Sequence, residues 1–313
     1  MIDFRYHIVS IVAVFLALGL GLFIGSTSLR GTVGRNITKQ TEAVTHRNNV
    51  LRGQLSDVRD QLKNDQAFDA ALTPYAVQGR LSGESVVVVS APNVDDSLRT
   101  DVLNVLTDAG ATINGDVRLQ DALVDPSQDQ FLGTLADKVA VNGHPLPNAS
   151  GGVRALALLA DVLVTNGQHS PVSRNAAAKV LAAYDAGNLV SVSGNQPTPA
   201  NLTVLLAAPA ATSGDASVNA QKTSLLATFA RYLDRDSLGA VVAGPATAAD
   251  SGGLLDVVRS DKTARAAVST VDSVDTPSGV IATVFALADQ ELGRSGSYGP
   301  VSGADGPLPT PSP

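Results

Sequence analysis

The first apolar stretch of the chain runs from Ile8 to Leu29 and holds 22 consecutive residues without a charge. A bilayer core about 30 Å thick needs roughly 20 apolar residues in a helix, so this stretch can span it with a slight tilt. A cleavable signal peptide has a shorter apolar region, about 7 to 15 residues, and ends at a small-residue cleavage site. Residues 25–27 (Gly-Ser-Thr) form a poor site of that kind. The sequence therefore predicts an uncleaved transmembrane anchor over residues 1–30.

A heptad pattern follows the anchor and predicts a stalk over residues 31–75. One set of positions recurs every seven residues and a second set falls four residues after each of them: Ile37, Val44, Leu51 and Val58, then Thr41, Asn48, Leu55 and Leu62. We interpret the first set as heptad positions a and the second as positions d, and β-branched residues at most a positions with Leu at the later d positions favour a parallel two-stranded coiled coil. The alternative is one amphipathic helix lying along the globular domain. An anchor that already holds two stalks in parallel favours the homodimer.

Two glycines inside the apolar stretch, Gly21 and Gly25, form a GxxxG pattern. Small residues at this spacing let two helices approach closely in lipid, so the pair is a candidate packing face between two anchors. Glycine is also common in membrane helices that make no such contact. The pattern alone leaves both interpretations open.

Strand and helix patterns alternate through residues 76–294. Residues 85–90 (SVVVVS) form an apolar run typical of a strand buried on both faces. A helical pattern over residues 98–109 and a strand at residues 111–117 complete a β-α-β unit. Further apolar runs lie at residues 160–165, 189–193, 202–207 and 239–243, helical patterns at residues 175–186 and 221–233, and a last apolar segment at residues 280–292. This alternation predicts an α/β domain with a doubly wound, mostly parallel sheet and helices on both faces.

Polar residues follow several predicted strands, where parallel sheets bind their ligands. Asn93, Asp95 and Asp96 come after the first strand, and Ser193 and Asn195 after a later one. We expect a crevice at this edge, although Asp95 and Asp96 can equally serve only as helix caps. The sequence has no glycine-rich phosphate loop after a strand and no nucleophile motif, so we expect neither a nucleotide cofactor nor an enzyme.

Basic and acidic residues are distributed unevenly along the chain, and this distribution limits the kinds of molecule that each part can bind. Residues 30–65 hold seven Lys or Arg against four Asp or Glu, net +3, while residues 66–313 hold 14 against 24, net −10. An acidic domain repels nucleic acid, and the basic base of the stalk suits anionic lipid headgroups. The final segment, residues 295–313, is rich in Gly, Pro and Ser with one charge, which predicts a disordered tail.

Candidate metal ligands are few. The chain has no Cys, which excludes disulfides and thiolate sites, and only one Met. His144 and His169 are the two histidines beyond the stalk, and neither has a partner at metal-ligand spacing. A solvated loop histidine is the ordinary interpretation, so both are weak metal candidates and we expect no resident cofactor.

Four segments of the chain are distinctive: the opening MIDFRYHIVSIVAVFLALGLGLFIGS, the stalk ending near Phe68 and Leu72, the strand ESVVVVSAP, and the late STVDSVDTPSGVIATVFALADQ followed by SYG. In these segments the chain resembles the mycobacterial copper transport protein B family of actinobacteria. The resemblance covers nearly the whole chain up to the tail. It implies an envelope protein of copper efflux, proposed to form pores in the outer membrane. Relatives are also linked to a partner membrane protein and to control of septal cell-wall hydrolysis.

Two functions of different classes follow. The resemblance implies a component of copper transport, with copper as the only implied ligand. The residues favour a non-enzymatic dimeric scaffold for a second envelope membrane protein, since Cu(I) prefers the thiolate and thioether ligands that this chain lacks. Buried strands separated by helices also do not suit a transmembrane barrel.

Charge distribution and family resemblance predict opposite sides of the membrane for the α/β domain. Four basic residues lie within 20 positions after the anchor against Arg5 before it, which favours a cytoplasmic domain. The charge rule weakens when a long domain follows the span. The resemblance implies an extracytoplasmic domain on a single-pass protein of the cell membrane, with the outer membrane as the alternative, and we expect the extracytoplasmic placement.

Overall fold

The computed structural model describes residues 4–167 and 172–309, and the side chains of residue 4 and of residues 27–43 lie outside that description. The chain divides into two compact units, Met1–Asp65 and Gln66–Pro313. The first unit is helical, and the second contains the sheet and the remaining helices.

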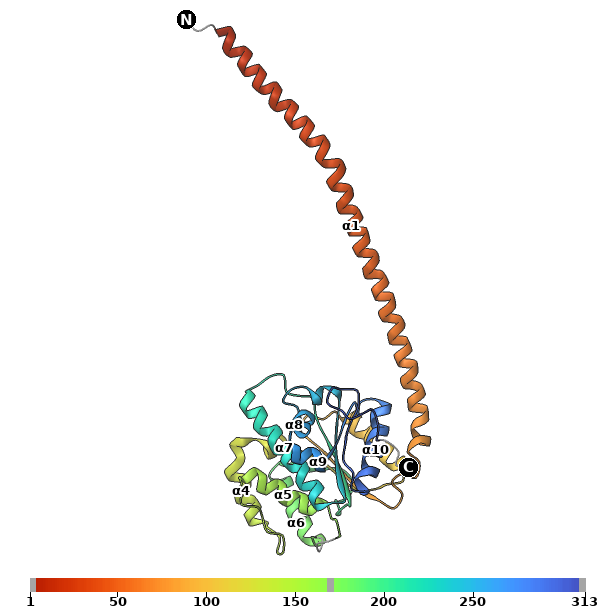
Figure 1. The fold of residues 1–313 in the computed structure, drawn as a ribbon. Helices are drawn as coiled ribbons and strands as arrows, with labels where there is room; N and C mark the ends of the chain where they lie inside the picture. Colours follow the sequence, from red (N-terminus) through yellow and green to blue (C-terminus); the bar gives the residue numbers. More distant parts are fainter. Residues whose placement is uncertain (1–3, 168–171, 310–313) are drawn as a thin grey trace. The chain divides into compact units, whose positions relative to one another are not determined.

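Helix α1 (Phe4–Val77) is one uninterrupted helix of 74 residues (Figure 1). The predicted anchor and stalk are therefore parts of the same helix, without a helix end near residue 30. Its segment Arg5–Ser26 is long and apolar enough to cross a membrane, and none of that segment is buried in the protein. Exposure of so many large apolar side chains is unfavourable in water, which agrees with a lipid environment for this segment.

In the described part of the chain, seven strands form one sheet in the order β3-β2-β1-β4-β5-β6-β7. The strands are β1 (Ser85–Ser90), β2 (Thr112–Leu119), β3 (Val190–Val192), β4 (Leu202–Leu206), β5 (Gly239–Gly244), β6 (Ser269–Asp272) and β7 (Ser297–Tyr298). All pairings are parallel except that of β3 with β2. The chain order runs outward from β1 in both directions, so β1 and β4 flank the topological switch point. The predicted doubly wound, mostly parallel sheet is confirmed.

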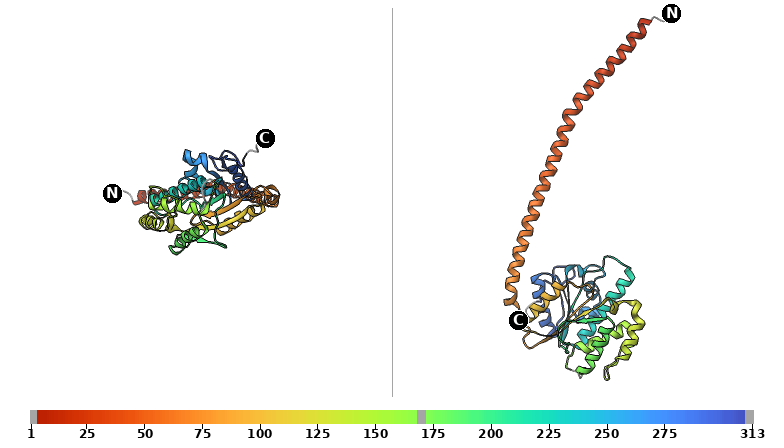
Figure 2. Two further views of the ribbon diagram at one scale, coloured as in Figure 1. Left: turned by 90° about the horizontal axis from the view of Figure 1, so that it is seen from below. Right: turned by 180° about the vertical axis from the view of Figure 1, so that it is seen from behind.

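Helices cover both faces of the sheet, as Figure 1 and the right-hand view of Figure 2 show. They are α2 (Asp96–Asp108), α3 (Asp121–Val124), α4 (Asp129–Lys138), α5 (Gly151–Leu163), α6 (Arg174–Ala186), α7 (Ala216–Asp236), α8 (Leu254–Ser260), α9 (Lys262–Ala267) and α10 (Pro277–Glu291), with 3-10 turns η1 (Pro126–Gln128) and η2 (Ala246–Ala249). Alternation along β1 builds two cores: Val86 and Val88 pack with α2 and α10, whereas Val87 and Val89 pack with α5 and α7.

The apolar run at residues 160–165 is not the strand that the sequence predicted. Residues 160–163 are the last turn of α5, and only Val164 makes an isolated bridge, to Ala200 beside β4. Helix α5 is apolar almost all round and nearly all of its residues are buried. A buried helix lacks the one-sided pattern of a surface helix, so the apolar run at its end was interpreted as a buried strand.

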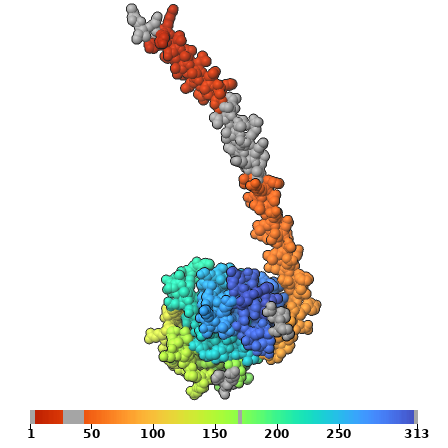
Figure 3. Space-filling view, in the orientation of Figure 1, coloured from red at the N-terminus to blue at the C-terminus, as the bar shows by residue number. Residues whose placement is uncertain are grey.

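The segment from residue 295 to residue 309 is ordered, so the predicted disordered tail is wrong for these residues. Strand β7 pairs in parallel with β6, and the ring of Tyr298 is buried in the core beside α10. Asp305 accepts a hydrogen bond from the backbone N–H of Ser297 at 2.9 Å. In Figure 3 the dark blue residues near the C-terminus lie against the globular unit. The Gly- and Pro-rich composition gave no indication of β7, whose two residues are held in place by tertiary packing.

Candidate functional site

The carboxyl edge of the sheet carries a cluster of four charged side chains beside α2. Strand β1 ends at Ser90, and the chain turns through Asn93, whose φ of +65° is a conformation that Asn tolerates better than most residues. Asp95 then caps α2, accepting hydrogen bonds from the backbone N–H of Ser97 at 2.8 Å and from its hydroxyl. The Ser97 hydroxyl and backbone N–H hold the pKa of Asp95 below its ordinary value. Asp95 is therefore occupied as a cap.

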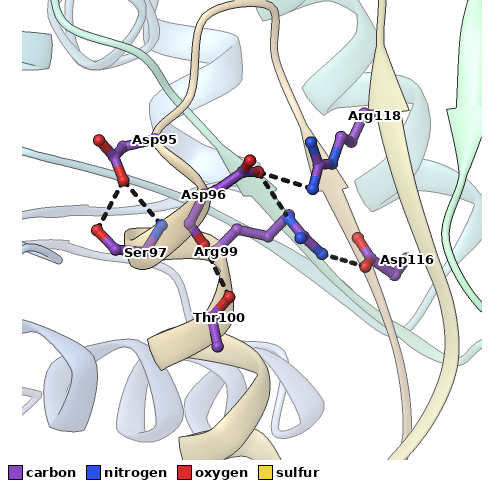
Figure 4. A network of polar contacts seen from close by, with 7 residues as sticks. All are labelled: Asp95, Asp96, Ser97, Arg99, Thr100, Asp116 and Arg118. Atoms are coloured by element: carbon purple, nitrogen blue, oxygen red, sulfur yellow. Dashed lines mark hydrogen bonds and ion pairs between the residues drawn. The ribbon is translucent and has the colours of Figure 1, made fainter.

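The cluster itself joins the first turns of α2 to the end of β2 (Figure 4). Asp96 Oδ1 lies 2.7 Å from Arg118 Nη2 and 3.6 Å from Arg99 Nε. Arg99 Nη1 donates to Asp116 Oδ2 on the strand below. Two carboxylates and two guanidiniums thus alternate, so the four side chains together carry no net charge.

Strand alternation explains why two of these charges meet under α2. Along β2, Val117 and Leu119 point into the core with α5, so Asp116 and Arg118 point to the opposite face, where α2 packs. Both α2 residues of the cluster lie one turn apart on the helix, which brings them to the same strand. The arrangement of the four charged side chains therefore follows from the two-residue alternation along β2 and the helical spacing of Asp96 and Arg99 along α2, both of which are visible in the sequence.

A cavity of about 190 Å³ lies between the end of β1, the start of α2 and the end of β2. Its walls include Ser90, Asp96, Arg99, Arg118 and Gln120. Several buried polar atoms here have no hydrogen-bond partner among the described residues: Ser90 Oγ, Arg99 Nε, Arg118 Nε and Asp116 Oδ1. Buried polar groups are nearly always paired, so this concentration of unpaired atoms marks the edge as a candidate binding site.

The structure separates the predicted crevice residues into two groups. Asn93 and Asp96 line the cavity, and Asp95 caps the adjacent helix. Ser193 and Asn195 do not join them, because β3 runs antiparallel to β2 and its carboxyl end points to the other edge of the sheet. The prediction of one shared edge was wrong for these two residues, since a three-residue strand gives no sequence signal for its direction.

Four functional candidates were missed by the sequence analysis: Ser90, Arg99, Asp116 and Arg118. The signal that identifies the last two was present, because two opposite charges alternating with Val and Leu near the end of a buried strand are unusual. Ser90 and Arg99 are ordinary residues in sequence, and only the fold brings them to the same cavity.

A larger cavity of about 1370 Å³ contains His144. Its walls include Arg235 and Asp236, which end α7 directly before β5 begins, so it lies at the edge of the sheet where the parallel strands begin. His144 Nδ1 is 3.8 Å from Asp161 Oδ2. Burial, and secondarily the charge of Asp236, raise the pKa of Asp161.

Copper chemistry can be compared with this second cavity. His144, Asp161 and Asp236 offer nitrogen and oxygen donors, which suit Cu(II) better than Cu(I). Within residues 4–167 and 172–309, no group of three or more side chains is arranged to hold a metal ion. His169, the other predicted candidate, lies outside the described residues.

Helix α1 presents the remaining predicted surfaces. Val44, Leu51, Leu55, Val58 and Leu62 are each at least half exposed. The side chain of Ile37 lies outside the described residues. An added Cβ at Gly21 or Gly25 would touch nothing within 4 Å, so both positions are open to an external helix.

Comparison with known proteins gives one consistent result. A family described as "Copper transport outer membrane protein, MctB" matches residues 1–309. The proteins named "Copper transporter MctB" of Mycobacterium bovis and Mycobacterium tuberculosis are 28% identical to this chain over 317 residues, covering 97% of this chain and 98% of theirs. That of Mycobacterium leprae shows the same identity and coverage.

Proposed function

The chain belongs to the family of copper transport outer membrane proteins, MctB, and from this membership we propose that it is a membrane-anchored component of copper transport in a bacterial cell envelope. The observation that carries the proposal is the match over residues 1–309, which includes both the apolar helix and the α/β unit. Relatives of nearly equal length are named copper transporters, and none of those names describes an enzyme.

Anchoring rests on the segment Arg5–Ser26 of α1. The segment is 22 residues long, and its most apolar window of 18 residues has a mean hydropathy of 2.7. One span of this kind holds the protein in a membrane, whereas a single span cannot enclose an ion path by itself. We therefore propose a single-pass protein with an extracytoplasmic α/β unit, whose part in copper transport is exercised with other envelope components.

The stalk supports a dimeric form of this component. Five apolar side chains between residues 44 and 62 are exposed along one stripe of α1. A parallel partner helix would cover them, and the GxxxG face at Gly21 and Gly25 allows the anchors of the same pair to approach. The proposed homodimer keeps two α/β units on the same side of the membrane.

We propose that the α/β unit does not itself bind copper tightly, so that its part in copper transport is indirect. Cu(I) requires soft sulfur ligands for tight binding, and the sequence holds no Cys and one Met at position 1. Calorimetric titration of Cu(I) and Cu(II) into the full-length protein in lipid nanodiscs should show no submicromolar site. Submicromolar binding that disappears in a His144→Ala, His169→Ala double variant would contradict this part of the proposal.

The transport role is tested by the copper content of cells. Deleting the gene should raise cell-associated copper, measured by mass spectrometry of the metal at raised external copper, and the intact gene should restore the original level. A version lacking residues 1–30 should fail to restore it. Equal copper content with and without the gene would overturn the proposal.

A second candidate function is a dimeric scaffold that binds a membrane protein of the envelope and regulates septal cell-wall hydrolysis. The observation that favours it is the exposed apolar stripe of the stalk, because such a stripe suits a protein–protein interaction whether or not the protein takes part in copper transport. Deletion would then alter cell separation, seen by microscopy, without changing copper content. The two measurements on one deletion strain separate the two functions.

A further inference from the structure

Three buried atoms at the cavity beside α2 can donate a hydrogen bond, and none has an acceptor among the described residues. They are Ser90 Oγ, Arg99 Nε and Arg118 Nε, and all three residues line the cavity. Ser90 is only 2% exposed. An arginine Nε–H can only donate, so the group that these three atoms lack is an acceptor oxygen. The fourth unpaired atom of the cluster, Asp116 Oδ1, is an acceptor, but Asp116 is not among the residues that line the cavity. Buried donors without partners are costly, and their convergence indicates a ligand rich in acceptors.

The carboxylate of Asp96 indicates where such a group fits. Its Oδ1 lies between the guanidiniums of Arg99 and Arg118, near enough to bond one and too far to bond the other (Figure 4). The Asp96 side chain is 69% exposed, so it can rotate into solvent, and an exposed ion pair contributes little to stability.

We propose that this cavity binds the carboxylate group of a small ligand, and that Asp96 competes for the same position. An incoming carboxylate bonds the Nε–H groups of Arg99 and Arg118 and the hydroxyl of Ser90, which are the contacts that Asp96 does not make. Guanidinium edges favour planar, paired contacts with carboxylates.

Charge and size agree with a small monoanion. When Asp96 turns out, the remaining Arg99, Arg118 and Asp116 carry a net charge of +1, which one carboxylate neutralises. Asp121 also lines the cavity, but its charge is balanced by Lys222 at 3.2 Å. A volume of about 190 Å³ is below the roughly 300 to 1,000 Å³ of drug-sized sites, so it admits a small acid or the end of a longer chain. A free acid and a peptide C-terminus share this chemistry. The site is independent of the proposed copper function.

The test uses full-length protein in lipid nanodiscs and saturation-transfer NMR of the ligand. Acetate represents a free acid and N-acetylglycine a peptide C-terminus, with acetamide and N-acetylglycinamide as uncharged controls. We expect binding of at least one carboxylate and of neither amide. A tighter acetate indicates a free acid, and a tighter N-acetylglycine indicates a peptide end. Failure of both carboxylates to bind wild type and Asp96→Ala would overturn the proposal.

Variants give effects of opposite sign. Asp96→Ala should tighten carboxylate binding about three- to fivefold, because the competing ion pair is lost. Arg118→Gln should abolish binding, whereas Arg231→Gln, a control on the exposed face of α7, should leave it unchanged. Ser90→Ala should weaken binding while keeping the melting temperature, which excludes misfolding as the cause. Unchanged affinity in both Asp96→Ala and Ser90→Ala would contradict the assigned geometry.

Discussion

A buried ion pair fastens the last strand to the sheet at the level of single residues. Arg259 and Asp272 are 7% and 0% exposed, with Arg259 Nη2 at 2.7 Å from Asp272 Oδ2. The same guanidinium donates to Thr270 and to the backbone carbonyl of Tyr298, and Asp272 accepts from the backbone N–H of Val301. These bonds link β6 to the C-terminal segment that composition alone assigned to a disordered tail.

We expect Asp272→Asn to lower the free energy of unfolding by about 3–5 kcal/mol, because it leaves the guanidinium of Arg259 buried without its charge partner. Arg265–Asp305 is a matched surface pair at 2.7 Å, with side chains 47% and 49% exposed. Arg265→Gln should cost at most about 1 kcal/mol. Urea unfolding followed by circular dichroism measures both. Equal losses of unfolding free energy in the two variants would show that burial does not determine how much the Arg259–Asp272 pair contributes to stability.

Residue-level prediction from the sequence succeeded where a residue's role is local. The Asp95 cap could be expected because it depends only on a polar residue before a helical pattern. Ser90 and Arg99 could not be recognised, since their importance comes from β1, α2 and β2 meeting at one edge. A side chain whose function depends on contacts across 20 or more residues has no signature in its own neighbourhood.

At the scale of elements, the stalk register decides how α1 pairs. A step of four residues in a heptad leads from d to a, so Val44, Leu51 and Val58 occupy d positions and Asn48, Leu55 and Leu62 occupy a positions. The prediction of two strands from the sequence used the reverse assignment, with β-branched residues at a and Leu at d, and was wrong on this point, because Leu at a with β-branched residues at d does not by itself favour two strands. Asn48 at an a position specifies register and oligomeric state, and it is the residue that carries the preference for a dimer.

Replacing both Leu51 and Leu55 with Gln should convert the proposed dimer to a monomer, because the two central apolar layers of the seam are lost. Full-length protein in detergent is measured by light scattering with correction for the micelle. Leu292→Gln, an exposed apolar residue outside the stalk, is the control and should stay dimeric. Wild type that is already monomeric at high concentration would contradict the coiled coil.

Elements with strong patterns were predicted better than short ones. The apolar runs of β1, β4 and β5 and the one-sided pattern of α7 were read correctly, and the run at residues 189–193 corresponds to β3. Strand β3 has only three residues and gives no signal for its direction, and β7, with two residues, carries too little periodicity to show its existence. Pairing with neighbours, rather than intrinsic preference, determines such strands.

For the whole molecule, one continuous helix connects a lipid-suited segment to a folded unit that is strongly acidic. Helix α1 changes character along its length, from apolar on all sides to a single exposed stripe. Residues 30–65 carry a net charge of +3 and residues 66–313 carry −10. The basic part can contact anionic headgroups, while an acidic unit is repelled by them, so lipid binding by electrostatic attraction is expected of the stalk and not of the α/β unit.

Retention of the anchor is the last prediction. Because residues 8–29 exceed the length of a signal-peptide apolar region, the mature protein should keep its original N-terminal segment. Membrane fractions should retain the protein through a high-salt wash, and mass spectrometry should find peptides that begin before residue 8. A variant lacking residues 1–30 keeps most of the basic stalk, so it should bind anionic vesicles weakly and leave them as salt screens the charges. A new N-terminus near Ser26 or Ser28 in the membrane fraction would show that the apolar segment is a cleaved signal, and salt release of the full-length chain would show that the segment does not anchor the protein.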